Sequence, residues 1–361
     1  MLDSTLPNQG FKPFTIGDKK ISVPLALAPM SGVTNHSFRE LIVRTNPRAV
    51  GLVVSEFISV EALTRHNPRC VQMMRYGEKQ RPFSVQVFGY DIQRMADAAK
   101  MAEQAGADIV DINSGCPAPK VVRKGGGCEL MRQPEHLAKA LSTVRKGISI
   151  PLTLKIRAGW DSDLRNGLEI AKIAEGEGIS MLAVHGRTKS EGYRGLADWK
   201  IIEEIATTLK IPVIGSGDVT CFQSAKERFA SGVAGLMIGR AALSNPWVFS
   251  EVAAGFEGRD FQTPDYLATV DILETYLELV LEEMPEKGAI GKMKQFASQV
   301  TRRVPGSKMV RHALTRSQSL AEFSEKLEEW REYLHNKQKD GVFPPPGTST
   351  EVNPLARQSA C

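Results

Sequence analysis

The chain has 361 residues, of which 42% are hydrophobic and 24% charged, and its formal net charge is +5. This composition is typical of globular proteins and excludes a largely disordered chain, while so mild a positive charge fits metabolic enzymes as well as nucleic-acid binders. No apolar stretch approaches the roughly 20 residues that span a bilayer, and the first residues lack a secretory signal pattern. The cysteines and histidines show no zinc-binding spacing. We therefore expect a cytoplasmic protein with no membrane segment and no metal, and we expect a monomer.

Short apolar segments alternate with helical patterns between residues 25 and 240. The segments cover residues 25–30, 52–57, 83–89, 108–113, 151–157, 181–185, 212–216 and 235–240. Between them, apolar residues recur at spacings of three and four, which is the helical period. Strands that alternate with helices predict parallel βαβ units. Eight such units in about 225 residues match a closed (β/α)₈ barrel, the TIM-barrel fold.

An open, doubly wound α/β sheet is the rival fold. Such a sheet usually carries a Gly-x-Gly-x-x-Gly turn after its first strand, whereas this turn reads Pro29-Met30-Ser31-Gly32. Segments such as 25–28 and 52–54 are continuous apolar runs, which are typical of strands buried on both faces. The sequence therefore favours the barrel.

The strand pattern ends after Pro246, and the rest of the chain reads as helical. The first helix is predicted to have Thr263 as its N-cap and Pro264 in its first turn, and to end at Pro285. A second helix is predicted around residues 290–300, and a third opens with the capping-box pattern Ser319-x-x-Glu322. We therefore expect a catalytic barrel in residues 1–252, an all-helical domain in residues 253–340 and a disordered tail in residues 341–361.

The ends of the barrel strands are where reactive groups are expected. Strands seven and eight end in Ser216-Gly217-Asp218 and Gly239-Arg240, and the loops after these two strands commonly bind phosphate in this fold. Lys155 would place a buried positive charge beside an anionic ring such as a reduced flavin, and Gln86 offers both a donor and an acceptor to a pyrimidine edge.

The fourth strand leads into Cys116, which lies between Gly115 and Pro117. A thiol with a reference pKa near 8.5 is mostly protonated at neutral pH and can act as a general acid. Basic residues follow at Lys120, Arg123 and Lys124. Cysteines are often inert core residues, but a position in a loop at a strand end favours a catalytic role for Cys116. Cys128, after a run of three glycines that resembles a flap, is interpreted as incidental.

The chain resembles the tRNA-dihydrouridine synthase family from about residue 24 to residue 334. The motifs that carry the resemblance are Pro29-Met30-Ser31-Gly32-Val33-Thr34, Gln86-Val87-Phe88-Gly89, Asn113-Ser114-Gly115-Cys116-Pro117, His185-Gly186-Arg187-Thr188 and Ala197-Asp198-Trp199. One position departs from the family pattern, because Ser216 stands where an asparagine is usual.

This resemblance implies a noncovalent FMN, reduced by NADPH, that delivers a hydride to C6 of a uridine in tRNA while Cys116 protonates C5. The D-loop is the usual target. Asn113 would face the uracil, and Arg187 would also contact the substrate. The residues expected to hold FMN are Pro29, Met30, Ser31, Gln86, Lys155, His185, Ser216, Gly217, Asp218, Gly239 and Arg240.

A basic run in the helical region supports an RNA partner. Residues 287–316 contain eight lysines and arginines and no acidic residue, and the helical period places several on one side of the second predicted helix. Such a face beside a barrel mouth suits tRNA docking. We expect Lys292, Arg302, Arg303 and Arg311 to contact phosphates.

Other functions fit parts of the pattern. A flavin barrel that acts on a free pyrimidine, as dihydroorotate dehydrogenase does, would share the strand ends but would not need the basic helices. A barrel that binds a sugar phosphate without redox chemistry, or an RNA-binding module with an inactive barrel, would purify without a yellow flavin. The sequence does not specify which uridine is modified or whether NADPH is preferred over NADH.

Overall fold

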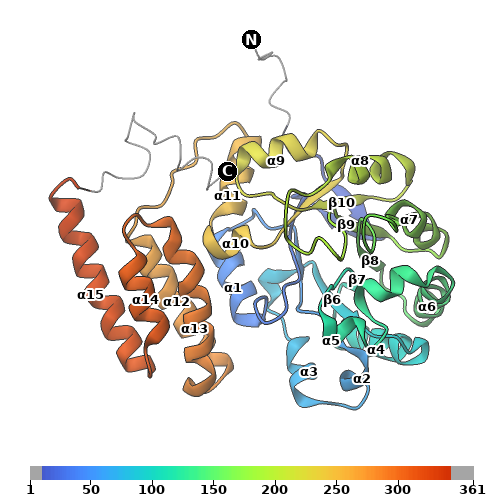
Figure 1. Ribbon diagram of the computed structural model, residues 1–361, viewed down its shortest axis with the longest axis horizontal. Helices are drawn as coiled ribbons and strands as arrows, with labels where there is room; N and C mark the ends of the chain where they lie inside the picture. Colours follow the sequence, from blue (N-terminus) through green and yellow to red (C-terminus); the bar gives the residue numbers. More distant parts are fainter. Residues whose placement is uncertain (1–9, 343–361) are drawn as a thin grey trace, which may run out of the picture.

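The computed structural model describes residues 10–342 of the chain and shows a barrel with a bundle of helices at its side (Figure 1). The tail predicted from residue 341 onward therefore lies almost wholly outside the described residues. The eight barrel strands are β3 (Leu25–Leu27), β4 (Leu52–Val54), β6 (Phe83–Phe88), β7 (Ile109–Ser114), β8 (Leu152–Arg157), β9 (Met181–His185), β10 (Val213–Ser216) and β11 (Gly235–Ile238).

The strands are all parallel, and the sheet closes on itself. Its order is β4-β3-β11-β10-β9-β8-β7-β6, and β4 also pairs with β6, with Val53 opposite Phe83. A short extra strand, β5 (Ile58–Ser59), pairs with the end of β6. All eight predicted segments are strands of this barrel, so the TIM-barrel prediction is confirmed.

Helices surround the barrel because each buries one apolar face against the strands. In α4 (Ile92–Gln104), Asp91 caps the amide of Arg94, and Met95, Ala98 and Ala99 are buried. The other helices and short 3₁₀ turns of this part are α1 (His36–Thr45), α2 (Val60–Leu63), α3 (Pro68–Met73), η1 (Glu78–Gln80), α5 (Pro119–Val122), η2 (Gly127–Arg132), α6 (Pro134–Gly147), α7 (Gly167–Gly176), α8 (Trp199–Thr208), α9 (Phe222–Phe229), α10 (Ala241–Ser244) and α11 (Val248–Phe256).

The barrel interior is apolar at one end and polar at the other. An N-terminal hairpin, β1 (Phe14–Ile16) and β2 (Lys19–Ile21), buries Ile16 and Ile21 in one cluster with residues at the strand starts, among them Leu52 and Met181. This cluster fills the N-terminal end of the barrel. The charged and amide side chains are left for the opposite end, where barrel enzymes place their chemistry.

The helical domain consists of α12 (Ala268–Glu283), α13 (Glu286–Val300), η3 (Thr301–Arg303), α14 (Lys308–Arg316) and α15 (Leu320–Lys339). The first helix begins later than predicted, because Asp265, not Thr263, accepts a hydrogen bond from the amide of Ala268. Helix α14 was not predicted, and only its Leu314 is buried. At α15 the predicted cap is present, since Ser319 accepts from the amide of Glu322 at 3.1 Å.

A polar and aromatic junction joins the two parts. Glu283, the last residue of α12, accepts hydrogen bonds from the side chain of Asn35 and from the amide of Ser37, at 2.9 and 3.0 Å. Its negative charge therefore lies at the N-terminus of α1, where the helix dipole favours it. The ring of Phe38 packs edge-on against Tyr276 and Phe296 of the helical domain. In Figure 1 the helix α1 lies between the barrel strands and α12.

The packing of the barrel continues past residue 252. Helix α11 runs to Phe256, whose ring contacts Phe222 and Phe229 of the barrel helix α9. The division at residues 252 and 253 remains a prediction. Within residues 10–342, no helix is long and apolar enough to cross a membrane, and no group of three or more histidine, cysteine or acidic side chains could hold a metal ion.

Candidate active site

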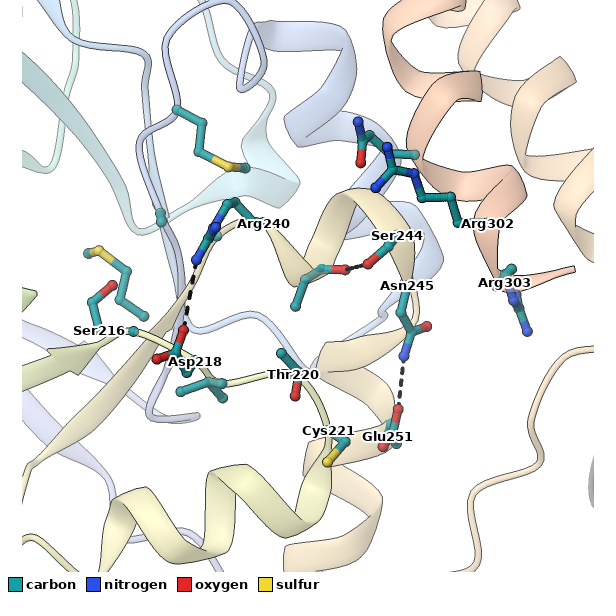
Figure 2. Close-up of a pocket in the computed structure, with 18 of the residues that line it drawn as sticks. Ser216, Asp218, Thr220, Cys221, Arg240, Ser244, Asn245, Glu251, Arg302 and Arg303 are labelled. Carbon is teal, nitrogen blue, oxygen red and sulfur yellow. Dashed lines mark hydrogen bonds and ion pairs between the residues drawn. The ribbon is translucent and has the colours of Figure 1, made fainter. Parts of the chain in front are cut away.

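A cavity of about 850 Å³ opens at the C-terminal ends of the strands and extends toward the helical domain. Figure 2 shows Ser216, Asp218 and Arg240 on its barrel side and Arg302 and Arg303 on the side of the helical domain. The predicted cofactor residues that line it are Pro29, Met30, Lys155, His185, Ser216, Gly217, Asp218, Gly239 and Arg240. Ser31 and Gln86 are not among its lining residues. The volume lies within the roughly 300–1,000 Å³ typical of cofactor pockets.

The loop after β10 is fixed around Asp218. This residue has a φ of 54°, in the left-handed region that residues other than glycine rarely adopt. Its carboxylate accepts two hydrogen bonds from Nη2 of Arg187, both at 2.8 Å, and one from the amide of Ala197 at 2.7 Å. Arg240 lies 3.8 Å from the same carboxylate. Arg187 is only 1% exposed and is not among the residues that line the cavity. Its contact with the substrate remains a prediction.

Gly217 needs to be glycine for two reasons. Its φ is 123°, and a Cβ at this position would lie 2.6 Å from Cβ of Ala197 and 3.1 Å from the ring of His185. Without a side chain, its backbone stays open to the cavity, as expected of a loop that binds a phosphate.

His185 is buried and Lys155 is half-buried at the cavity, and desolvation acts on both. Desolvation, together with the positive charges of Lys155 and Arg157, lowers the pKa of His185 to about 2, so its ring is neutral. Nε2 of His185 lies 3.2 Å from Nη1 of Arg187; because a guanidinium only donates, Nε2 must accept and Nδ1 carries the proton. Desolvation likewise lowers the pKa of Lys155 to about 8, so the ammonium remains mostly charged at neutral pH.

Asn113 holds the loop that carries Cys116. Its Oδ1 accepts from the amides of Gly115 and Cys116, at 3.2 and 2.9 Å. The carbonyl of Cys116 accepts from the amide of Cys128 at 3.1 Å. Gly127 has a φ of 61°, and a Cβ there would lie 2.6 Å from the carbonyl oxygen of Cys116. The glycine run therefore packs tightly against the cysteine loop.

Cys116 is a protonated thiol at neutral pH. Burial raises its pKa, and this outweighs the opposing effects of the backbone of Ala118 and of the charges of Arg157 and Lys120. Cys128 is fully buried, and desolvation raises the pKa of its thiol to about 12. A buried thiol that keeps its proton can donate it to a reacting carbon, and Cys116 is the one that lies in the strand-end loop.

A buried chain of polar side chains lies beneath this loop, inside the barrel. Nδ2 of Asn113 donates to Oε1 of Gln86 at 2.8 Å, and Nε2 of Gln86 donates to Oδ2 of Asp111 at 2.5 Å. Oδ1 of Asp111 accepts from the hydroxyl of Thr153, also at 2.5 Å. Asn113 lies opposite Lys155 in the register of β7 and β8. Because Lys155 lines the cavity, these polar side chains lie next to the cavity wall.

Tyr193 and Arg157 are among the site residues that were not predicted. Tyr193 lines the cavity and is 57% exposed, and the guanidinium of Arg240 lies 4.5 Å from the centre of its ring. Arg157 donates to the carbonyl of Gly115 at 2.8 Å and to the carbonyls of Thr188 and Gly192 at 3.0 and 2.8 Å. Arg157 is the last residue of β8, so its place at a strand end was the available signal.

The four predicted phosphate contacts have different surroundings. Nζ of Lys292 donates to the carbonyl of Gly32 at 2.7 Å. Arg303 lies 4.3 Å from the centre of the Trp247 ring and donates to the carbonyl of Pro264, and burial lowers its pKa to about 10. Arg302 is exposed. Arg311 is half-buried and lies 3.2 Å from the hydroxyl of Ser307.

The fold and site define a barrel with a cavity at its strand ends and a protonated cysteine in the loop after β7. Cys116 is not among the residues that line the cavity, but its thiol interacts with the charge of Lys155, which does line it. A model of the family described as "Dihydrouridine synthase (Dus)" matches residues 26–338. A probable tRNA-dihydrouridine synthase of Rickettsia conorii is 35% identical over 320 residues, which are 87% of this chain and 95% of that protein. A tRNA-dihydrouridine synthase B of Pseudomonas syringae pv. tomato is 43% identical over 66% of this chain and 70% of that protein. The chain belongs to the dihydrouridine synthase family.

A solved structure supports the fold alone. A 2-naphthoyl-CoA reductase in complex with 2-naphthoyl-CoA aligns with a TM-score of 0.53 at 16% identity, over 69% of this chain and 52% of that one. At this identity, the likeness carries no information about the substrate of this chain.

Proposed function

We propose that this protein reduces the C5–C6 double bond of uridine in tRNA with FMN and NADPH, and that Cys116 donates the proton to C5. As a member of its family, the chain is an oxidoreductase that acts on a CH–CH bond of tRNA uridine. The observation that carries the proposal is that the thiol of buried, protonated Cys116 interacts with Lys155, which lines an open cavity together with His185 and the loop of Asp218. A cytoplasmic location fits such a substrate.

The residues present fit FMN. Gly217, which has no room for a Cβ beside Ala197 and His185, lines the cavity, and Arg240, Ser216 and the backbone after β10 and β11 offer donors for a phosphate. Ser216 stands where an asparagine is usual, and it offers a hydroxyl to the cavity in place of an amide. When bound, FMN supplies the hydride for C6 of the uracil. Lys155 supplies the positive charge that favours an anionic ring edge, and neutral His185 can donate through Nδ1.

Cys116 delivers the second hydrogen atom. Its thiol gives up a proton to C5 as the double bond is reduced, and the nearby charges of Arg157, Lys120 and Lys155 stabilise the thiolate that remains. Asn113, which holds the amide of Cys116, is the proposed contact to the uracil. The target uridine must leave its stack to enter the barrel, at a cost of a few kcal/mol, and contacts of the helical domain with the tRNA backbone would offset that cost.

The alternative activity, on a free pyrimidine, is not favoured. The family match extends through residue 338 and so includes the helical domain, which a free pyrimidine would not need. The position of the target uridine in the D-loop, the preference for NADPH and the monomeric state of the protein remain proposals.

A direct test uses the purified protein. It should be yellow, release FMN on denaturation, and form dihydrouridine in tRNA lacking this modification when NADPH is added. A colourless protein whose activity does not respond to added FMN, or one that reduces free uracil compounds but not tRNA, would overturn the proposal.

A further inference from the structure

We propose that Asp111 is a positioning residue, which acts on Cys116 through the side chains of Gln86 and Asn113. The consequence for catalysis rests on the proposed role of Cys116, whereas the effect on the loop does not. Asp111 lies in the middle of β7, 4% exposed, and no motif of the sequence marked it.

The hydrogen bonds that link Asp111, Gln86 and Asn113 all run in one direction. Asp111 accepts from Gln86, Gln86 accepts from Asn113, and Asn113 accepts from the amides of Gly115 and Cys116. This series of hydrogen bonds thus begins at an acceptor inside the barrel and ends at the backbone of the proposed proton donor. The bonds that link Asp111, Gln86, Asn113 and the amide of Cys116 are buried, so no bulk water competes for these groups.

The direction depends on the chemistry of the two ends. An ionised carboxylate only accepts, and a backbone amide only donates, whereas the side-chain amides of Gln86 and Asn113 have nearly isosteric oxygen and nitrogen ends. Asp111 and the two loop amides therefore require the same orientation of both side chains. Thr153 cannot impose a direction, because its hydroxyl can donate or accept.

Loss of the acceptor at position 111 would leave a buried N–H of Gln86 without a partner. Gln86 would then gain by turning its NH₂ group toward another acceptor, which would break its bond with Asn113 and loosen the cap on the cysteine loop. A charge role is the competing explanation, since Lys155 is the charged group that interacts with the Asp111 carboxylate. The two explanations differ in what they predict for asparagine at this position.

The experiment compares Asp111→Leu with Asp111→Asn. Asparagine keeps an acceptor for Gln86, provided that its NH₂ group faces the hydroxyl of Thr153, but it removes the charge. The readout is the rate of alkylation of Cys116 by iodoacetamide, followed by mass spectrometry of its peptide. Cys70, which is free and buried in helix α3, serves as the internal control for general loosening. This readout requires neither flavin nor tRNA, so it is independent of whether the proposed function holds.

Because the loop loosens, we expect Asp111→Leu to raise the alkylation rate of Cys116 at least about tenfold. We also expect it to slow dihydrouridine formation at least about tenfold, as misplacement of a reacting group does. Asp111→Asn should stay within about threefold of wild type in both. The proposal is wrong if the Asn and Leu variants are equally impaired, if the Leu variant leaves the alkylation of Cys116 unchanged, or if the alkylation of Cys70 changes as much as that of Cys116. If Asp111→Leu does not fold, Gln86→Leu breaks the next link, and an unchanged Cys116 there contradicts the proposal.

Discussion

Burial gives Lys155 and His185 their chemical states in this site. Desolvation is the largest effect on each, and it makes His185 a neutral donor while leaving Lys155 a cation at neutral pH that loses its proton as the pH rises through about 8. The same two residues in a solvated loop would have neither property. Their state therefore follows from the barrel, not from the residue type alone.

The pKa of Lys155 predicts a pH dependence. Because its pKa is lowered to about 8, the side chain is charged below that value and neutral above it. The rate of flavin reduction by NADPH should therefore be constant at lower pH and fall as the pH rises through about 8. Stopped-flow measurements across this range should show that decline in wild type and a low, flat profile in Lys155→Met. A decline of equal size in the variant would assign it to another group.

At the scale of elements, the strand ends could be predicted and their supports could not. Ser216, Asp218 and Arg240 follow apolar runs. The alternation of strand and helix patterns therefore placed them together at the C-terminal ends of the barrel strands. Arg157 was missed because its partners are backbone carbonyls of loops distant in sequence. Helix α14 was missed because its apolar face is short: of its residues only Leu314 is buried, with Val310 half-buried against the core.

The glycine run before Cys128 is expected to act on the cysteine loop. Gly127→Ala adds a Cβ 2.6 Å from the carbonyl of Cys116 and strains a φ of 61°. We expect dihydrouridine formation to fall at least about tenfold through displacement of Cys116, while flavin content stays near that of wild type. Gly176→Ala is the matched control, because no atom lies within 4 Å of its added Cβ. Equal activities of the two variants would show that the loop tolerates the change.

At the scale of the whole molecule, the junction at Glu283 fixes the helical domain to the barrel. Glu283→Ala removes the carboxylate from the N-terminus of α1 and leaves Asn35 and Ser37 without their partner. The loss should be about 1 kcal/mol of stability, as for other helix caps. Thermal unfolding would measure it. Glu282→Ala, which changes an exposed residue of the same helix, should leave the melting temperature unchanged, and two equal shifts would mean that the junction contributes nothing.

The basic helical domain makes a prediction about tRNA. The charge pattern identified four candidate contacts, but it could not show that Lys292 and Arg303 already bond to carbonyls of Gly32 and Pro264. Exposed Arg302 and half-buried Arg311 are better placed to meet phosphates. Replacing both with alanine should weaken tRNA binding and flatten the dependence of log K on log salt by nearly one unit per lost contact. Arg303→Ala should mainly lower stability, and parallel slopes for wild type and the double variant would place tRNA elsewhere.

The most direct test of the central claim is the dihydrouridine formed in tRNA by Cys116→Ala. With flavin and NADPH present, this variant should keep its flavin and its rate of NADPH oxidation but form dihydrouridine roughly 10²- to 10⁴-fold more slowly, the usual contribution of a general acid. Cys70→Ala, a buried cysteine of helix α3, is the control and should match wild type. Mass spectrometry of the tRNA nucleosides gives the rates. Dihydrouridine formed by Cys116→Ala at the wild-type rate would contradict the assignment of Cys116 as the proton donor.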